Sequence, residues 1–247
     1  MMPEKRLAIV TGGAGGIGLG IADALTDAGF RVVVFDISED RLASLDGTRL
    51  TGIRVDVTSE TEVVAAVGEV THRFGTIHVL VNNAGTIYNE PLINIMNREH
   101  PRHSFETFRK NIDINLNAAF LVGSVVAEQM ALKRTPGVII NISSISASGN
   151  AGQTAYSAAK AGVEAMTRVW SKELGTFGIR VAAVAPGFID TESTRKALNE
   201  QKLRELSGRI PLRRLGREAN VAGAVLAIIE NDYINGAVIP VDGGMVL

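Results

Sequence analysis

Short apolar runs recur along the whole chain, and their spacing limits the possible folds more than any other feature of the sequence. The runs are rich in Val and Ile and nearly continuous, which is typical of strands that are covered on both faces. They occupy residues 7–11, 31–36, 52–57, 78–83, 137–143, 179–186 and 236–242. Segments with the apolar spacing of helices lie between them, at residues 17–28, 59–74, 104–131, 154–175 and 217–229.

This alternation of strands and helices indicates βαβ units. We therefore predict an α/β fold, a single doubly wound Rossmann-type domain with a parallel seven-stranded sheet and helices on both faces. No linker, repeat or change in composition divides the chain, so the domain is expected to span residues 1–247. Ligands of such a sheet bind beyond the carboxyl ends of its strands.

Composition narrows the class of function. Lys and Arg number 25 and Asp and Glu 26, and the net charge of −1 favours neither a nucleic-acid nor a membrane surface as a partner. The chain has no cysteine, which excludes disulfides and thiolate metal sites. It begins without the apolar core of a signal peptide, and no apolar run is long enough to span a bilayer. We expect a cytoplasmic protein.

The first predicted strand leads into the glycine-rich stretch "TGGAGGIG" at residues 11–18. Two overlapping patterns fit this stretch, G-x-G-x-x-G starting at Gly13 and G-x-x-x-G-x-G starting at Gly12. Either pattern gives a tight turn and a helix N-terminus whose free N–H groups suit a pyrophosphate. The alternative is a glycine-rich turn without a ligand. Because the second strand ends in Asp36, where an acidic residue binds adenosine ribose hydroxyls, the two features together predict a dinucleotide site.

Polar residues also end the later predicted strands. Asp56 follows the third strand and could accept a hydrogen bond from an adenine amino group or serve as a turn residue. The stretch "NNAG" at residues 82–85 could support either a cofactor or the neighbouring strand. Ser143 ends the fifth strand, where a serine is either a cap or turn residue or a hydrogen-bond donor to a ligand.

Tyr156 and Lys160 are four residues apart on a predicted helix, so their side chains share one face. An ammonium beside a phenol favours the phenolate, which predicts that Lys160 lowers the pKa of Tyr156 and suits it to acid–base chemistry. Ser143 lies thirteen residues before Tyr156, and the two hydroxyls could converge on one ligand oxygen. The alternative is a helix-surface pair without a function.

Several of these elements follow one another in a fixed order and spacing: "TGGAGGIG", Asp36, "NNAG", Asn115 in "DINL", Ser143, "YSAAK" and "APGFIDT" at 185–191. In this order the chain resembles the classical short-chain dehydrogenases/reductases (SDR family). It looks most like their 3-oxoacyl-[acyl-carrier-protein] reductase-like branch. The resemblance covers essentially the whole chain, to "INGAVIPVDGGM" near its end.

The resemblance implies a role for each of four residues. Tyr156 is the general acid/base that exchanges a proton with the alcohol or ketone oxygen. Lys160 lowers the pKa of Tyr156 and binds the nicotinamide ribose, and Ser143 donates a hydrogen bond to the same substrate oxygen. Asn115 holds a water that links Lys160 to solvent. Hydride transfer belongs to the nicotinamide.

The resemblance also implies a cofactor site. Its residues are Gly12, Gly16, Ile17, Gly18, Asp36, Ile37, Asp56, Val57, Asn83, Ala84, Gly85, Tyr156, Lys160, Pro186, Gly187, Ile189 and Thr191. The backbone of Ile189 would meet the nicotinamide carboxamide, and Thr191 would lie near the phosphates. Residues 192–213 would form a mobile lid over the substrate.

The identity of residue 36 predicts the choice of cofactor. The Asp36 carboxylate can accept from both ribose hydroxyls of NAD, whereas it repels the 2′-phosphate of NADP. Ile37 and Ser38 supply no cation, and Arg41 is the nearest basic residue that could reach a 2′-phosphate. We therefore predict NAD(H) as the cofactor, with NADP(H) disfavoured.

The loop before Asn115 is longer than the resemblance leads us to expect. It has 29 residues between Gly85 and Asn115, about eight more than in compact relatives. The extra material falls within residues 86–104, an extended loop that would shape the substrate entrance or a subunit contact. His100 and His103 lie in this region without a complete ligand set, so no metal site is predicted.

The function predicted is an NAD(H)-dependent oxidoreductase that interconverts a secondary alcohol and a ketone. Its substrate would be a small ketone or alcohol, with an acyl thioester among the candidates. One alternative is a 3-oxoacyl-[acyl-carrier-protein] reductase of fatty-acid synthesis that uses NADPH. A remote alternative is a non-catalytic dinucleotide sensor, although such sensors usually lose the tyrosine or the lysine. The resemblance further implies a homotetramer.

Overall fold

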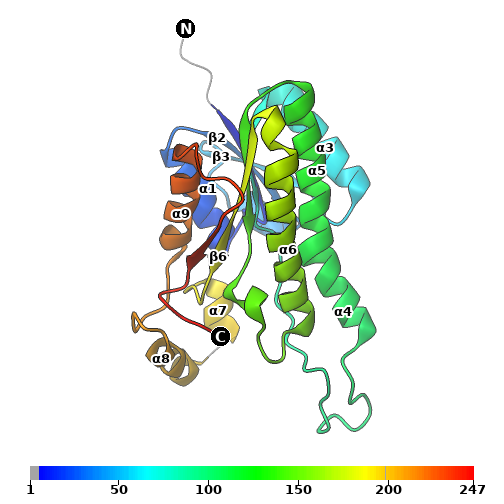
Figure 1. Ribbon diagram of the computed structural model, residues 1–247, viewed down its shortest axis with the longest axis vertical. Coiled ribbons are helices and arrows are strands. Elements are labelled where there is room, and N and C mark those ends of the chain that lie inside the picture. Colours follow the sequence, from blue (N-terminus) through cyan, green and yellow to red (C-terminus); the bar gives the residue numbers. More distant parts are fainter. Residues whose placement is uncertain (1–5, 198) are drawn as a thin grey trace.

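The computed structural model describes residues 6–197 and 199–247. Residues 1–5 of the predicted domain and residue 198 of the predicted lid lie outside the described residues. One parallel sheet runs through the molecule (Figure 1). Its strand order is β3-β2-β1-β4-β5-β6-β7. Its strands are β1 (Leu7–Thr11), β2 (Arg31–Asp36), β3 (Leu50–Arg54), β4 (Ile77–Asn82), β5 (Gly137–Ile142), β6 (Ile179–Pro186) and β7 (Val238–Val241).

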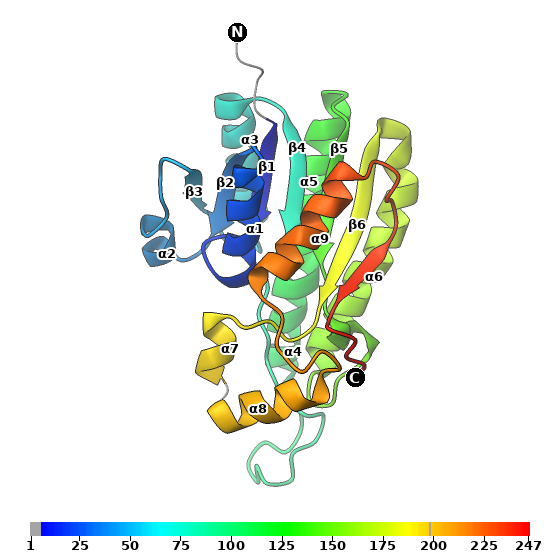
Figure 2. The same cartoon turned by 90° about the vertical axis from the view of Figure 1, so that its left-hand side faces the viewer.

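Helices cover both faces of the sheet, so the predicted doubly wound seven-stranded fold is confirmed (Figure 2). The helices are α1 (Gly16–Asp27), α2 (Glu39–Ala43), α3 (Glu60–Phe74), α4 (Phe105–Ile112), α5 (Ala118–Leu132), α6 (Thr154–Glu173), α7 (Glu192–Ala197), α8 (Glu200–Arg209) and α9 (Glu218–Glu230). The strand order reverses between β1 and β4, which makes the carboxyl ends of these two strands the expected place for a ligand.

The apolar runs are continuous because successive residues of one strand enter different cores. In β1, Ala8 and Val10 pack into the core beneath α1 and α9. Leu7 and Ile9 pack into the core beneath α3 and α5. Since side chains alternate between the faces of a strand, a sheet covered on both sides needs apolar residues at every position.

The segment 104–131, predicted as one helix, is interrupted. A π-helical turn at Asp113–Asn117 separates α4 from α5, and Asn115 lies inside it. Short π-helical segments hold one extra residue per turn and are frequent at functional sites. The interruption cannot be recognised from apolar spacing, because the residues on both sides keep helical periodicity.

A chain of buried polar side chains ties β4, β5 and α6 together. Asn82 Nδ2 donates to Asn141 Oδ1 at 3.0 Å. Asn141 Nδ2 then donates to Thr167 Oγ1 at 2.9 Å, and Thr167 itself donates to the carbonyl of Val163 at 2.8 Å. Because buried polar groups without partners are costly, these bonds hold the carboxyl ends of β4 and β5 at a fixed place beside α6.

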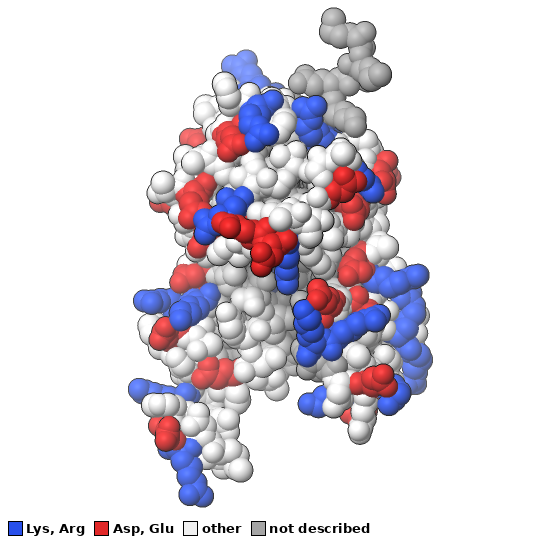
Figure 3. All heavy atoms as spheres, turned by 180° about the vertical axis from the view of Figure 1, so that it is seen from behind, with Lys and Arg blue, Asp and Glu red and all other residues white. Residues whose placement is uncertain are grey.

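Two projections stand at the carboxyl end of the sheet (Figures 1 and 2). One is formed by α7 and α8, within the predicted lid at residues 192–213. The other is the loop at residues 86–104, which folds back on itself through an antiparallel bridge between Ile93 and Arg102. Figure 3 shows charges of both signs on the two projections, with mostly uncharged surface between them.

The loop at residues 86–104 is attached to the start of α6. Glu90 N donates to the carbonyl of Gly152 at 2.8 Å, and Gln153 Nε2 donates to Asn89 Oδ1 at 2.8 Å. The side chain of His103 is only 7% exposed, and its Nε2 lies 3.8 Å from Glu90 Oε2. Throughout the described residues, neither a cluster of metal-binding side chains nor a helix able to span a membrane is found.

Candidate active site

The glycine-rich turn has no room for side chains at two of its positions. A Cβ on Gly12, which has a φ of +60°, would lie 2.9 Å from the Ala84 Cα. A Cβ on Gly18 would collide with the carbonyl oxygen of Gly12 and would lie 2.5 Å from Asn83 Nδ2. That amide donates to the carbonyls of Thr11 and Gly12, both at 3.0 Å. The turn is therefore packed directly against the segment that follows β4.

The backbone decides between the two glycine patterns. Gly12 and Gly16 have positive φ values of +60° and +52°, which favour glycine, whereas Gly13 and Gly15 do not. With the close contact at Gly18, this selects the pattern of Gly12, Gly16 and Gly18. The turn opens the twelve-residue helix α1, whose positive N-terminal end suits a pyrophosphate.

Asp36, at the end of β2, is held beside this turn. Its Oδ2 accepts from Ala14 N at 3.1 Å and its Oδ1 accepts from Ser38 N at 3.0 Å. The side chain is buried, while Ile37 next to it is exposed. A carboxylate fixed at the turn fits the ribose of a bound dinucleotide, and the glycine cradle fits its pyrophosphate.

The structure adds Arg41 to this site. Arg41 Nη1 lies 3.3 Å from the place that a Cβ on Gly15 would occupy, so the guanidinium rests against the glycine turn. A hydrogen bond from Lys196 lowers the pKa of Glu192, and the charge of Arg41 adds to this shift. The start of α7 thus lies on the side of the glycine turn that Arg41 contacts. Sequence separation alone does not reveal this arrangement, because Arg41 reaches Gly15 from α2.

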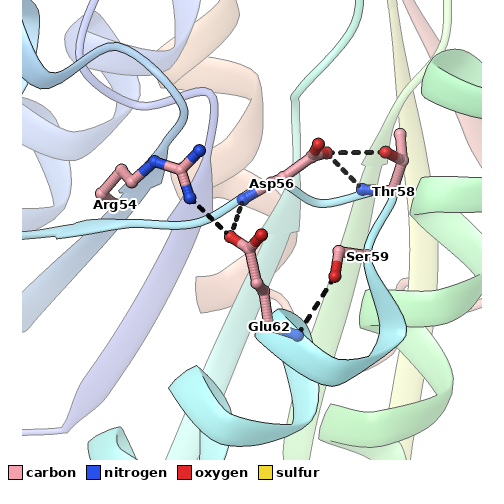
Figure 4. Close-up of polar contacts among 5 residues, drawn as sticks. All are labelled: Arg54, Asp56, Thr58, Ser59 and Glu62. Carbon is pink, nitrogen blue, oxygen red and sulfur yellow. Dashed lines mark hydrogen bonds and ion pairs between the residues drawn. The ribbon is translucent and has the colours of Figure 1, made fainter.

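Asp56 and its neighbours form a compact turn after β3 (Figure 4). Asp56 Oδ1 accepts from Thr58 N at 2.9 Å and from Thr58 Oγ1 at 2.7 Å. Asp56 N donates to Glu62 Oε2, which also accepts from Arg54 Nη1, both at 2.9 Å. The structure therefore assigns Asp56 a turn role, and the buried Val57 follows it. The contact with adenine stays a prediction.

Tyr156 and Lys160 lie on α6 and are both buried. Lys160 Nζ is 5.7 Å from the centre of the Tyr156 ring and donates to the carbonyl of Ile142 at 2.8 Å. Burial lowers the pKa of Lys160 to about 8. Burial also raises the pKa of Tyr156, and a side-chain hydrogen bond with Ser144 partly opposes this. The pKa of Tyr156 therefore lies above its ordinary value, because desolvation of the phenol dominates. That Lys160 lowers this pKa stays a prediction.

The hydroxyl of Ser143 contacts α6 in the structure, and its bond to a substrate oxygen stays a prediction. This hydroxyl is buried, donates to Glu164 Oε1 at 3.0 Å and lies 3.4 Å from the Lys160 carbonyl. Ser144 is half-buried, and its hydroxyl is the one bonded to Tyr156. Sequence spacing favoured Ser143, and the structure makes Ser144 a second candidate, because the side chains of successive residues point in different directions at a strand end. The two adjacent serines in the sequence indicated that either hydroxyl could lie beside Tyr156.

Asn115 joins the π-helical turn to the segment after β4. Its Nδ2 donates to the carbonyls of Thr86 at 2.8 Å and Asn111 at 3.0 Å, and its Oδ1 accepts from Thr86 N at 3.2 Å. A Cβ on Gly85 would lie 2.5 Å from Asn115 Oδ1 and 3.6 Å from Lys160 Nζ. The glycine thus allows Asn115 and Lys160 to approach the same stretch of backbone.

The segment after β6 closes the other side of the site. Pro186 ends the strand, and a Cβ on Gly187 would lie 2.8 Å from the Asp242 Cα. Ile189 is buried, and the chain then returns to the glycine turn, where Thr191 Cγ2 lies 3.8 Å from a Cβ placed on Gly16. Ile17 packs its side chain against the core, so only its backbone belongs to the turn.

Comparison with known proteins agrees with this geometry. The family model described as enoyl-(acyl carrier protein) reductase matches residues 12–246. The 3-oxoacyl-[acyl-carrier-protein] reductase FabG of Thermotoga maritima is 38% identical, with 100% of each chain covered. Human 3-hydroxyacyl-CoA dehydrogenase type-2 is 36% identical and covers 97% of this chain and 94% of its own. The crystal structure of gox2181 is 32% identical, with a TM-score of 0.88 over 98% of this chain and 95% of that one.

The sheet, the glycine turn, the side chains on α6 and these full-length similarities all agree. The chain belongs to the classical short-chain dehydrogenase/reductase family, in its 3-oxoacyl-[acyl-carrier-protein] reductase-like branch, and is an oxidoreductase that acts on a CH–OH group with a nicotinamide dinucleotide.

Proposed function

We propose that this oxidoreductase uses NAD(H) to interconvert the hydroxyl and oxo groups of an acyl thioester. One observation carries the reaction: a buried tyrosine, Tyr156, shares a hydrogen bond with Ser144, while Lys160 lies one helical turn away. The names of two relatives, a 3-oxoacyl-[acyl-carrier-protein] reductase and a 3-hydroxyacyl-CoA dehydrogenase, support the substrate class.

In the proposed reaction, a bound nicotinamide supplies or accepts the hydride. Tyr156 gives a proton to the oxo oxygen during reduction and takes one from the hydroxyl during oxidation. Ser144 donates a hydrogen bond to the same oxygen and so orients the substrate. Lys160 binds the ribose of the nicotinamide half, and Asn115 holds a water that connects Lys160 to solvent. The cofactor site is the full set of residues predicted above, with Arg41 added.

The substrate would enter between the two projections at the carboxyl end of the sheet. We propose that residues 192–213 act as its lid and that the loop at residues 86–104 selects it, within one domain spanning residues 1–247. The loop supports this role because Glu90 is bonded to Gly152, four residues before Tyr156. The loop also exposes large apolar side chains, namely Ile87, Tyr88, Leu92, Ile93, Ile95 and Met96, which suit an acyl chain.

The direct experiment is turnover by the purified protein. Acetoacetyl thioesters, a polyol series and a cyclic ketone are offered with NADH, and the matching alcohols with NAD. We expect the thioester to give the highest kcat/KM. A preference for a polyol or a cyclic ketone would overturn the substrate class, and cofactor binding without any turnover would favour a dinucleotide sensor.

Cofactor choice gives a quantitative prediction. The Asp36 carboxylate repels a 2′-phosphate, so we expect kcat/KM to favour NADH over NADPH at least tenfold, about 1.4 kcal/mol. Asp36→Ala combined with Ile37→Arg removes the repulsion and adds a cation, and it should narrow or reverse the preference. Steady-state kinetics with both cofactors measure it. Equal use of the two by the wild-type protein would contradict the role given to Asp36.

The second candidate is a 3-oxoacyl-[acyl-carrier-protein] reductase that uses NADPH in fatty-acid synthesis. The name of the Thermotoga maritima relative favours this reductase over the first candidate. The contact of Arg41 with the glycine turn adds support, because a guanidinium there suits a 2′-phosphate. A wild-type preference for NADPH that Arg41→Ala abolishes would select this candidate over the first.

We also propose a homotetramer, in keeping with the family resemblance. Its support in the structure is the exposure of large apolar side chains on neighbouring helices. Phe120 and Leu132 on α5 and Val169 on α6 are each about half exposed or more, at 55%, 74% and 49%. Contact between subunits would remove this apolar surface from water.

A further inference from the structure

Glu164 lies one helical turn beyond Lys160 on α6 and is anchored at both carboxylate oxygens. Its Oε1 accepts from Ser143 Oγ at 3.0 Å, and its Oε2 accepts from Arg168 Nη2 at 3.2 Å. The Glu164 side chain is only 18% exposed, whereas that of Arg168 is 54% exposed. The bond to Ser143 therefore lies on the protein side of the carboxylate and the ion pair on its solvent side.

Two consecutive residues at the end of β5 are thus bonded to α6. The carbonyl of Ile142 accepts from Lys160 Nζ at 2.8 Å, and the hydroxyl of Ser143 donates to Glu164. Ser143 N also donates to the carbonyl of Val184 in β6 at 2.7 Å. These bonds fix the last peptide groups before Ser144, so the direction in which Ser144 leaves the strand depends on them.

We propose that Glu164 is a positioning residue, which holds Ser143 and thereby keeps the Ser144 hydroxyl on Tyr156. This inference rests on the proposed function, because Ser144 matters only if Tyr156 is the acid/base. Glu164 acts through Ser143 and Ser144. Displacing a reacting group by about 1 Å can cost ~10²-fold in rate, so a residue placed one step away can have a large effect.

The first test needs neither substrate nor turnover. The chain has three tyrosines, of which Tyr88 and Tyr233 are exposed, so a Tyr88→Phe/Tyr233→Phe background leaves Tyr156 as the only phenol. The Ser144 bond lowers the pKa of Tyr156. Glu164→Ala should therefore make the phenol titrate at higher pH, as followed by phenolate absorbance.

Two matched variants serve as controls for this titration. Glu164→Gln keeps an oxygen that accepts from Ser143, and Arg168→Ala removes only the ion pair on the solvent side. Both should titrate as the parent does. An unchanged titration in Glu164→Ala, or an equal shift in Arg168→Ala, would overturn the proposal.

The second test is kinetic. Glu164→Ala should lower kcat about ten- to hundredfold and leave the KM for NADH within about twofold of its wild-type value. Ser143→Ala should have the same effect, and the double variant should be no worse than either, since both break one connection. A normal kcat, or a lowered Tm with no change in kcat, would mean that Glu164 has only a structural role.

Failure of the proposed function would look different. A wild-type protein that turns over no substrate in the panel would refute the reaction assigned to Tyr156. The Tyr156 titration would still report whether Glu164 controls the contact between Ser144 and the phenol. The two claims can therefore fail separately.

Discussion

Tyr156→Phe should lower turnover by ~10²–10⁴ in both directions, the loss expected when a positioned acid/base is removed. The substitution deletes one hydroxyl and keeps the aromatic ring, which is buried. NADH affinity should change little, because the ring stays in place. Stopped-flow or steady-state kinetics, with NADH binding followed by fluorescence, measure both effects.

The pH dependence of the reaction gives the same prediction a second readout. Oxidation needs the phenolate and reduction needs the phenol, so oxidation should increase with pH and reduction should be favoured at lower pH. Burial raises the pKa of Tyr156, which places the increase of oxidation above neutral pH. Tyr156→Phe should remove this dependence from the residual rate. Turnover close to that of the wild type would show that another group transfers the proton.

Lys160→Met should abolish most turnover, by at least ~10², and at the same time change how stability depends on pH. Burial lowers the pKa of Lys160 to about 8, whereas in the unfolded chain it is about 10.4. Below pH 8 the buried charge of Lys160 therefore destabilises the folded state. As the pH rises from about 8 to about 10.4, the folded state loses this proton first and the wild-type protein becomes more stable.

The size of this change follows from the shift. A difference of that size in pKa corresponds to about 3 kcal/mol. The free energy of unfolding of Lys160→Met, relative to that of the wild type, should fall by about this amount between pH 8 and pH 10.4. The lost bond to the Ile142 carbonyl costs about 1–3 kcal/mol at every pH and does not alter the slope. Urea denaturation of both proteins at several pH values measures the difference, and a constant difference would show that Lys160 is not held in a desolvating site.

The layers of the fold could be predicted from the sequence alone, because a sheet buried on both faces requires continuous apolar runs. Each core strand needs apolar residues at every position, as β1 shows, and runs of that kind between helices are typical of a parallel sheet covered on both faces. The glycine turn was also readable, since the positive φ of Gly12 and Gly16 requires residues without a Cβ.

The other contacts of the site could not be predicted, because the spacing of residues along the sequence does not determine their distances in space. The choice between Ser143 and Ser144 depends on the direction of one peptide at the end of β5, which the sequence does not show. The contact of Arg41 with Gly15 depends on where α2 leaves β2. The pKa of Tyr156 depends on burial and on the bond to Ser144, neither of which the sequence displays.

The π-helical turn at Asp113–Asn117 also separates two parts of the chain that can change at different rates. One residue more or less in a helix rotates everything beyond it by about 100°, which would turn Val122, Val126 and Met130 of α5 away from the core. A change in the length of the loop before α4 causes no such rotation, because this length does not set the orientation of α5. Insertions and deletions in evolution should therefore accumulate at residues 86–104 and be absent from 113–132, so that the loop proposed to select the substrate can change in length without moving α5.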